Sequence, residues 1–179
     1  MTSKKLVYDT LNFQNMGDCV PRDLWCLPWA QERYPQELAE IYRDYPSDMI
    51  SPPVIFDWKD IASGDQFAEG ESTDAWGCHF SNIHKGIVGE VKEALVKDDD
   101  WSDVNAVHIP LEWLSVNVEK TNKELEKYSG RFTYIGCPRP FEQLQFIRKS
   151  ENFYIDLVER PAKMMEFMEK MHYFYCQYF

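Results

Sequence analysis

The sequence lacks the features that mark most membrane, secreted and metal-binding proteins. No apolar run approaches the ~20 residues of a membrane-spanning helix, and the opening MTSKKLVYDT contains no signal-peptide core. The five cysteines form no CxxC pair and show no zinc-ribbon spacing, which argues against a disulfide framework or a structural zinc site. We therefore expect a cytoplasmic protein whose chain by itself holds no metal or cofactor.

Basic residues are also scarce. The chain has 19 lysines and arginines against 30 acidic residues, a net charge of −11, which argues against binding to nucleic acid or to an anionic membrane. No P-loop, GxGxxG or HExxH motif and no internal repeat is found. By contrast, 44% of the residues are apolar and 15% aromatic, so we expect a globular chain with a core.

Strand and helix signals alternate at the start of the chain. The β-branched and aromatic content of residues 20–27 predicts a strand, and Pro35 then stands where the first turn of a helix tolerates proline. Pro46 ends this helix, and residues 47–56 predict a second short strand that stops at a double proline. These signals predict a β/α/β unit over residues 18–56.

The middle of the chain has a different character. Five of the eight glycines lie between positions 64 and 89, and a hairpin is expected near Lys85 and Gly86. Leu111, Leu114, Val118 and Leu125 indicate a helix, and residues 131–136 a strand.

We expect one domain over residues 1–179 with an α/β architecture and a parallel sheet. It would contain an N-terminal arm at 1–17, the first β/α/β unit and an irregular, hairpin-containing excursion at 57–108. A helix, a strand and a long helix pair would follow at 109–179.

The C-terminal segment places a wide apolar stripe on one helical face. Its residues are Met164, Met165, Met168, Met171, Tyr175, Tyr178 and Phe179. Two interpretations stay open: a homodimer or a separate partner chain covers this stripe, or the helix docks on the core of its own chain.

Three stretches together resemble the N-terminal part of the uroporphyrinogen decarboxylase superfamily, which includes that decarboxylase and the corrinoid-linked methyltransferases. They are VPRDLWCLPWAQERYPQELAEIY, DAWGCHFSNIHKGIVGEVKEALVKDDDW and IGCPRPFEQLQFIRKSENFYIDLVERPAKMMEFMEKMHYFY. The resemblance spans roughly residues 18–179 and depends on the ordered combination of the three stretches. It implies a partial (β/α)₈ TIM barrel containing about the first three β/α units.

The resemblance also implies a ligand site at the mouth of that barrel. We expect a small anionic or tetrapyrrole-related ligand, because a rigid arginine between two prolines suits a carboxylate. The expected ligand-binding residues are Arg22, Trp25, Arg33, Cys137, Arg139, Pro140 and Phe141. From the residues alone, Arg139 is as well suited to pairing with Glu142 as to holding a ligand.

The resemblance leaves the reaction open. Pro28 stands where the decarboxylase motif has an arginine, and the strand-end aspartate of that motif has no counterpart in MISPPV. These differences favour a methyltransferase-type relative over the decarboxylase of porphyrin and haem synthesis. Zinc and a corrinoid would then belong to a longer, intact protein, and the present chain alone is expected to be inactive. A third alternative is a non-catalytic binding or assembly module that a partner chain completes.

Overall fold

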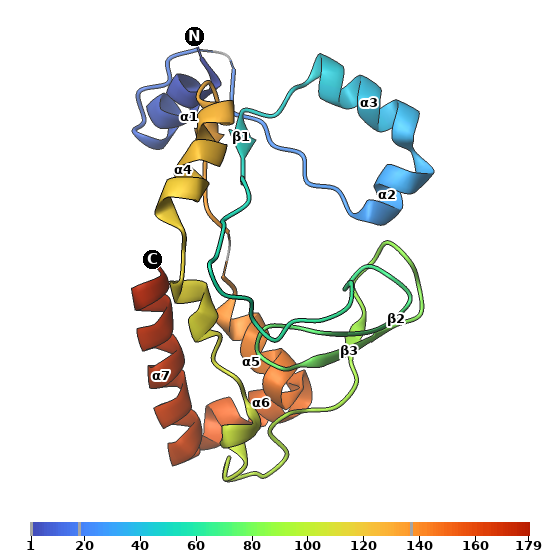
Figure 1. Cartoon of the computed structure of the whole chain (residues 1–179), viewed down its shortest axis with the longest axis vertical. Helices are drawn as coiled ribbons and strands as arrows, with labels where there is room; N and C mark the ends of the chain where they lie inside the picture. Colours follow the sequence, from blue (N-terminus) through green and yellow to red (C-terminus); the bar gives the residue numbers. More distant parts are fainter. Residues whose placement is uncertain (1, 18, 137) are drawn as a thin grey trace. The chain divides into compact units, whose positions relative to one another are not determined.

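The computed structural model describes residues 2–17, 19–136 and 138–179 (Figure 1). The chain divides into two compact units, and each unit joins two separate chain segments. Unit 1 combines Met1–Ile55 with Val116–Cys137, and unit 2 combines Phe56–Ser115 with Pro138–Phe179. Each unit therefore depends on contacts between residues far apart in the sequence.

Unit 1 is built around a short parallel pair of strands. Its elements are α1 (Ser3–Leu11), α2 (Pro28–Arg33), α3 (Pro35–Asp44), β1 (Met49–Ile50), α4 (Val118–Leu125), the 3₁₀ helix η3 (Glu126–Tyr128) and β5 (Phe132–Thr133). Met49 pairs with Phe132 and Ile50 with Thr133. Figure 1 shows α2 and α3 projecting away from this pair, and neither helix buries a residue.

The buried residue Asp48 holds three parts of unit 1 together through its carboxylate and its backbone. It accepts hydrogen bonds from the Ser3 hydroxyl at 2.6 Å and the Arg22 backbone N–H at 2.9 Å. The Asp48 backbone N–H donates to the Arg22 carbonyl at 2.8 Å, and its carbonyl accepts from the Phe132 N–H at 3.0 Å. With 8% of its surface exposed, Asp48 is satisfied by these partners, as a buried carboxylate must be.

Unit 2 contains the main hydrophobic core. Its elements are β2 (Gly70–Thr73), β3 (His79–Asn82), β4 (Glu90–Val91), the 3₁₀ helices η1 (Val104–Ala106) and η2 (Leu111–Leu114), α5 (Pro140–Arg148), α6 (Ser150–Glu159) and α7 (Ala162–Tyr178). The three strands form an antiparallel sheet in the order β2-β3-β4. The largest apolar side chains of the core are Trp76, Trp101, Phe80, Phe153, Phe167 and Phe174.

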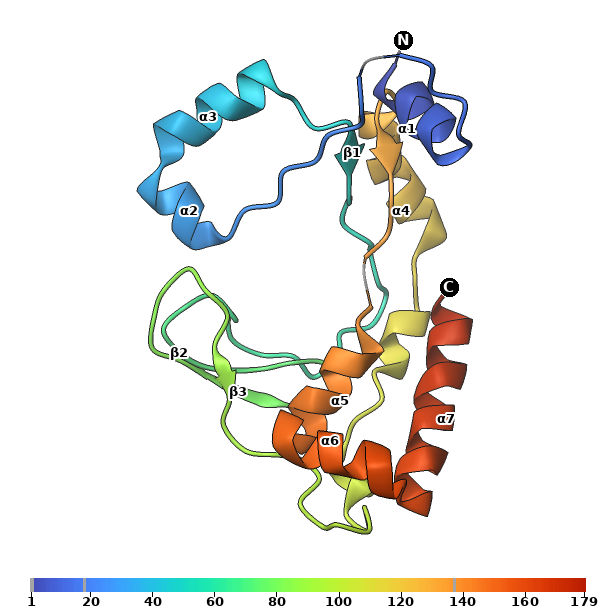
Figure 2. The ribbon, with the colours of Figure 1, turned by 180° about the vertical axis from the view of Figure 1, so that it is seen from behind.

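Helix α7 docks on the core of its own unit. It buries Met164, Phe167, Met171 and Phe174, and Phe174 meets Trp76 edge-on with ring centroids 5.6 Å apart. Both views show α7 beside the segment that carries η1 and η2 (Figures 1 and 2). The apolar stripe expected from the sequence is thus covered largely by the chain itself, the second of the two interpretations.

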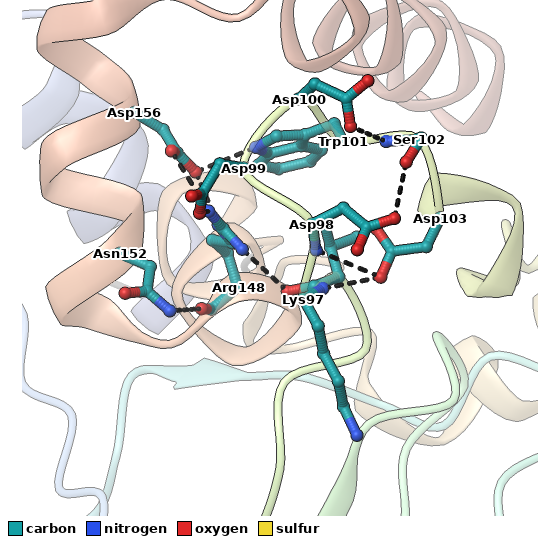
Figure 3. A network of polar contacts seen from close by, with 11 residues as sticks. Lys97, Asp98, Asp99, Asp100, Trp101, Ser102, Asp103, Arg148, Asn152 and Asp156 are labelled. Carbon is teal, nitrogen blue, oxygen red and sulfur yellow. Dashed lines mark hydrogen bonds and ion pairs between the residues drawn. The ribbon is translucent and has the colours of Figure 1, made fainter.

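A buried polar network joins α5, α6 and the loop before η1 (Figure 3). Arg148 Nε donates to Asp156 Oδ2 at 2.8 Å, and both side chains are 2% exposed. Trp101 Nε1 donates to the same oxygen at 2.8 Å, while Arg148 Nη2 reaches Asp99, which is 98% exposed. The network fixes the loop onto the two helices from inside the core.

The expected partial TIM barrel is wrong. The described residues contain five short strands in two small sheets, one of two parallel strands and one of three antiparallel strands, and no repeated β/α unit. Residues 20–27, predicted as a strand, form no strand, and β1 covers only two residues of 47–56. Pro52 and Pro53 follow β1 after a single serine, and because proline has no N–H they cannot continue a ladder.

Several local expectations agree with the structure. Strands β3 and β4 pair antiparallel on either side of Lys85 and Gly86, where the hairpin was expected, and Gly86 has a positive φ of 86°. Helix α3 begins at Pro35. The single helix expected from Leu111 to Leu125 is instead split into η2 and α4, because Asn117 caps α4 by accepting from the Lys120 N–H at 2.9 Å.

Candidate functional site

A cavity with a chemically varied lining lies in unit 1 and is called here the unit 1 pocket. It has a volume of about 350 Å³. Its lining combines aromatic, hydroxyl and charged side chains: Asp23, Leu24, Trp25, Tyr42, Pro46, Ser47, Met49, Ile50, Ser51, Arg131 and Tyr134. Such a mixture of apolar walls with a few convergent polar groups is typical of small-molecule sites.

The parallel strand pair positions the polar side of the pocket. Arg131 directly precedes β5, and Tyr134 directly follows it. Ser51 directly follows β1, and Ser47 lies two residues before it. The register of β1 and β5 therefore brings residues about eighty positions apart in sequence to one cavity.

Asp23 is the acidic group of the pocket. Its Oδ1 lies 2.7 Å from the Ser47 hydroxyl oxygen, which lies equally close to the Met49 carbonyl and can donate its single proton to one of them at a time. The Tyr134 hydroxyl donates to Asp23 Oδ2 at 3.5 Å. The carboxylate is therefore partly satisfied within the protein.

Arg131 is the other charged group in the lining. Among the described residues its guanidinium has no ion pair or hydrogen-bond acceptor, whereas its backbone N–H donates to the Tyr128 carbonyl. A guanidinium presents five N–H donors in a fixed fork that matches a carboxylate or phosphate. Arg131 thus leaves a full set of cationic donors available at the pocket.

Tyr42 lines the pocket from α3. A hydrogen bond with the Cys26 thiol raises the pKa of the Tyr42 phenol, and burial and the charge of Asp23 act in the same direction. The phenol is therefore neutral at physiological pH and keeps its proton for donation.

Three of the residues predicted as ligand-binding belong to unit 1. Trp25 lines the pocket with 75% of its surface exposed. The Arg22 guanidinium instead lies over the Tyr45 ring, 5.4 Å from its centroid. Arg33, in the last turn of α2, lines a separate hollow and not the unit 1 pocket.

Three others belong to unit 2. Arg139 pairs with Glu142 at 2.7 Å, the structural alternative that the sequence left open. Pro140 is the first residue of α5 and lines an apolar cavity with residues of α7. Phe141 packs edge-on against Phe153 with ring centroids 5.3 Å apart. Cys137 lies outside the described residues, so its predicted role stays a prediction.

Sequence reasoning missed Arg131, Tyr134, Asp23 and Ser47. A usable signal was present, because Arg131 and Tyr134 flank the strand residues Phe132 and Thr133 in a segment already predicted as a strand. What the sequence did not indicate was the partner strand, since no local pattern links β5 to β1.

A polar cluster in unit 2 surrounds Cys78, a residue type that can act as a nucleophile. Burial raises the pKa of the Cys78 thiol far above its ordinary value, and the neighbouring Asp74 carboxylate adds to this, so the thiol is protonated and a poor nucleophile at neutral pH. Asp74 and Gln143 are hydrogen-bonded to each other at 2.8 Å beside it. Within the described ranges, no group of three or more histidine, cysteine or acidic residues is placed to hold a metal ion.

Comparisons with known proteins identify no relative. The chain matches no family model, no curated protein and no solved structure. In the described part of the chain, no helix combines the length and apolarity needed to span a membrane.

Proposed function

We propose that the chain is a binding module whose unit 1 pocket holds a small anionic ligand with a planar part. The observation that carries this proposal is the Arg131 guanidinium, which has no acceptor among the described residues and lies at a cavity walled by Trp25, Tyr42 and Tyr134. An arginine fork binds one carboxylate through two hydrogen bonds, and aromatic walls favour a flat group beside it.

The size of the pocket limits the size of the ligand that it can hold. A volume of about 350 Å³ lies near the lower end of the ~300–1,000 Å³ range of ligand pockets. This favours a single small ring carrying a carboxylate over a whole tetrapyrrole. The three sequence stretches still predict kinship with the uroporphyrinogen decarboxylase superfamily. A decarboxylase or corrinoid-linked methyltransferase activity of a longer protein likewise stays a prediction.

Pyrrole-2-carboxylate is a suitable probe, with pyrrole-2-carboxamide as its uncharged counterpart. Calorimetric titration of the full chain should show that the carboxylate binds and that Arg131→Gln weakens it by about tenfold or more, since a charge-assisted hydrogen bond contributes roughly 1.5–3 kcal/mol. The matched control is Arg33→Gln, which removes an exposed arginine outside the pocket. Equal affinity for carboxylate and carboxamide, or an unchanged Arg131→Gln variant, would refute the proposal.

A second candidate function, assembly with another protein, is supported by α2 and α3. Neither helix buries a residue, and Trp29, Tyr34, Ile41 and Tyr45 are all more than 40% exposed. Apolar groups gathered on an exposed helical face are typical of interaction surfaces. Because a net charge of −11 repels a second copy, the expected partner is a different protein with an apolar surface and a basic rim.

Light scattering during size exclusion tests this second candidate. The chain alone should be a monomer at low salt, and it should bind an apolar fluorescent dye less well after Ile41→Lys. Val158→Lys is the control, because Val158 is an exposed apolar residue of unit 2. A stable dimer would indicate that the partner is a second copy of this chain. Dye binding unchanged by Ile41→Lys would refute the proposal that α2 and α3 form an interaction surface.

A further inference from the structure

The lining of the unit 1 pocket carries two opposite charges that are not paired with each other. Asp23 and Arg131 both border the cavity. Within the described residues, the Asp23 carboxylate has two hydroxyl neighbours, Ser47 at 2.7 Å and Tyr134 at 3.5 Å. The Arg131 guanidinium has no acceptor there. One cavity therefore offers both an anion-binding and a cation-binding group.

The Asp23 carboxylate retains the capacity to accept further hydrogen bonds. Its two oxygens provide about four acceptor positions. Ser47 shares its single proton between Asp23 Oδ1 and the Met49 carbonyl, both at 2.7 Å, and the 3.5 Å contact with the Tyr134 hydroxyl is long for a hydrogen bond. Neither hydroxyl carries a charge. An ammonium group, with three N–H donors and a positive charge, is the partner that this carboxylate lacks.

Aromatic side chains line the same space as the two charges. Trp25 is 75% exposed and borders the cavity, so a flat group lying against its ring would remove apolar surface from water. Tyr42 borders the cavity from α3, and the charge of Asp23 contributes to raising the pKa of its phenol. The carboxylate and the aromatic lining therefore act on the same ligand volume.

The net charge of the chain bears on the charge of the ligand. At −11, the protein repels an approaching anion over the distance at which charges act in solution. A ligand that carries one positive and one negative charge is neutral overall and is not repelled. The chain is thus better suited to a zwitterion than to a simple carboxylate.

We infer that the unit 1 pocket binds an aromatic amino acid as its zwitterion. The ligand carboxylate pairs with Arg131, its ammonium group pairs with Asp23, and its ring lies against Trp25. The inference rests on the proposed function, because it uses the same Arg131 contact, and it adds the ammonium group as a second requirement. The volume of about 350 Å³ suits one ring on a short chain.

Calorimetric titration of the full chain with two matched probes tests the inference. L-Phenylalanine carries both charges, and 3-phenylpropionate has the same ring, chain and carboxylate but no ammonium group. Phenylalanine should bind about tenfold or more tightly, the effect of one charge-assisted hydrogen bond. Arg131→Gln should weaken the binding of both probes, since both use the carboxylate.

Asp23→Asn should abolish the preference for phenylalanine. The asparagine can still accept from the Ser47 hydroxyl, so this contact is kept, but the negative charge is gone. The variant should also bind 3-phenylpropionate more tightly than the native chain does, because a repelling carboxylate has been removed from the cavity. Asp44→Asn is the control: it removes one exposed acidic charge of unit 1 outside the pocket and should keep the preference.

The outcomes separate this inference from the proposed function. Absence of phenylalanine binding, equal binding of the two probes, or a preference that survives Asp23→Asn would overturn the inference and leave the anion site in place. Failure of the proposed function itself would be seen with 3-phenylpropionate, whose binding would then be unchanged by Arg131→Gln.

Discussion

Removing the Asp156 carboxylate should destabilise unit 2 strongly, because it leaves the Arg148 charge buried without its main partner. The two side chains are each 2% exposed, and Asp156 Oδ2 accepts from both Arg148 Nε and Trp101 Nε1 at 2.8 Å. Breaking such a buried pair costs roughly 3–5 kcal/mol. Arg148 keeps only the Val96 carbonyl and the exposed carboxylate of Asp99, and neither compensates inside the core.

A double variant gives this prediction its sharpest form. Replacing both partners, Arg148→Met with Asp156→Leu, removes the two charges together and fills their volume with apolar atoms. The remaining loss is about 1–3 kcal/mol, the cost of leaving the Trp101 N–H without an acceptor. The double variant should therefore be more stable than Asp156→Ala alone.

Urea unfolding followed by tryptophan fluorescence measures these differences, since Trp101 lies within the network. Lys163→Ala is the control, because its ion pair with Asp100 is exposed and should contribute only about 0–1 kcal/mol. The reasoning would be refuted if Asp156→Ala lowered the free energy of unfolding by less than about 1 kcal/mol. It would also be refuted if the double variant lost as much stability as Arg148→Met and Asp156→Leu lose in sum.

Three further outcomes are expected. Asp48→Ala should lower the unfolding free energy by about 1–3 kcal/mol in a thermal melt, because a hydroxyl and a backbone N–H lose their buried acceptor, and an unchanged melting temperature would contradict this. Burial, with the charge of Asp74 in support, raises the pKa of Tyr175 to about 12, above the ordinary value of 10.0. The folded state therefore holds this proton more tightly than the unfolded state, so stability falls as pH rises from 10 through 12, and Tyr175→Phe should flatten that fall in alkaline unfolding curves. Because burial raises the pKa of Cys78, iodoacetamide should modify exposed Cys19 before Cys78 in a mass-spectrometric time course, and equal rates for these two thiols in the folded chain would contradict the burial of Cys78.

Features that depend on neighbouring residues could be predicted from the sequence. Pro35 marks the start of α3, and Lys85 and Gly86 lie in the turn between β3 and β4. The apolar spacing after Pro161 predicts α7, which begins at the next residue. These signals are local, since a fixed φ, a missing N–H or a helical repeat acts within a few residues.

The candidate site was predicted only in part, for the same reason. Trp25 lies in the unit 1 pocket as one of the residues chosen from the sequence, but Arg131 was not chosen. Arg139 looked equally suited to a ligand, and its position at the start of α5 places it against Glu142. Whether an arginine is free or paired depends on what the fold brings beside it.

The sequence by itself determined the acidic character of the chain, helices α3 and α7 and the hairpin, because composition and short-range spacing are sufficient for these. Only the tertiary structure decided the strand pairing, in which β1 meets β5 and residues 20–27 form no strand despite their β-forming composition. It also decided that α7 docks on its own unit and that Arg148 and Asp156 are buried together. Pairing and burial follow from contacts between distant segments, and their free energy outweighs local propensity.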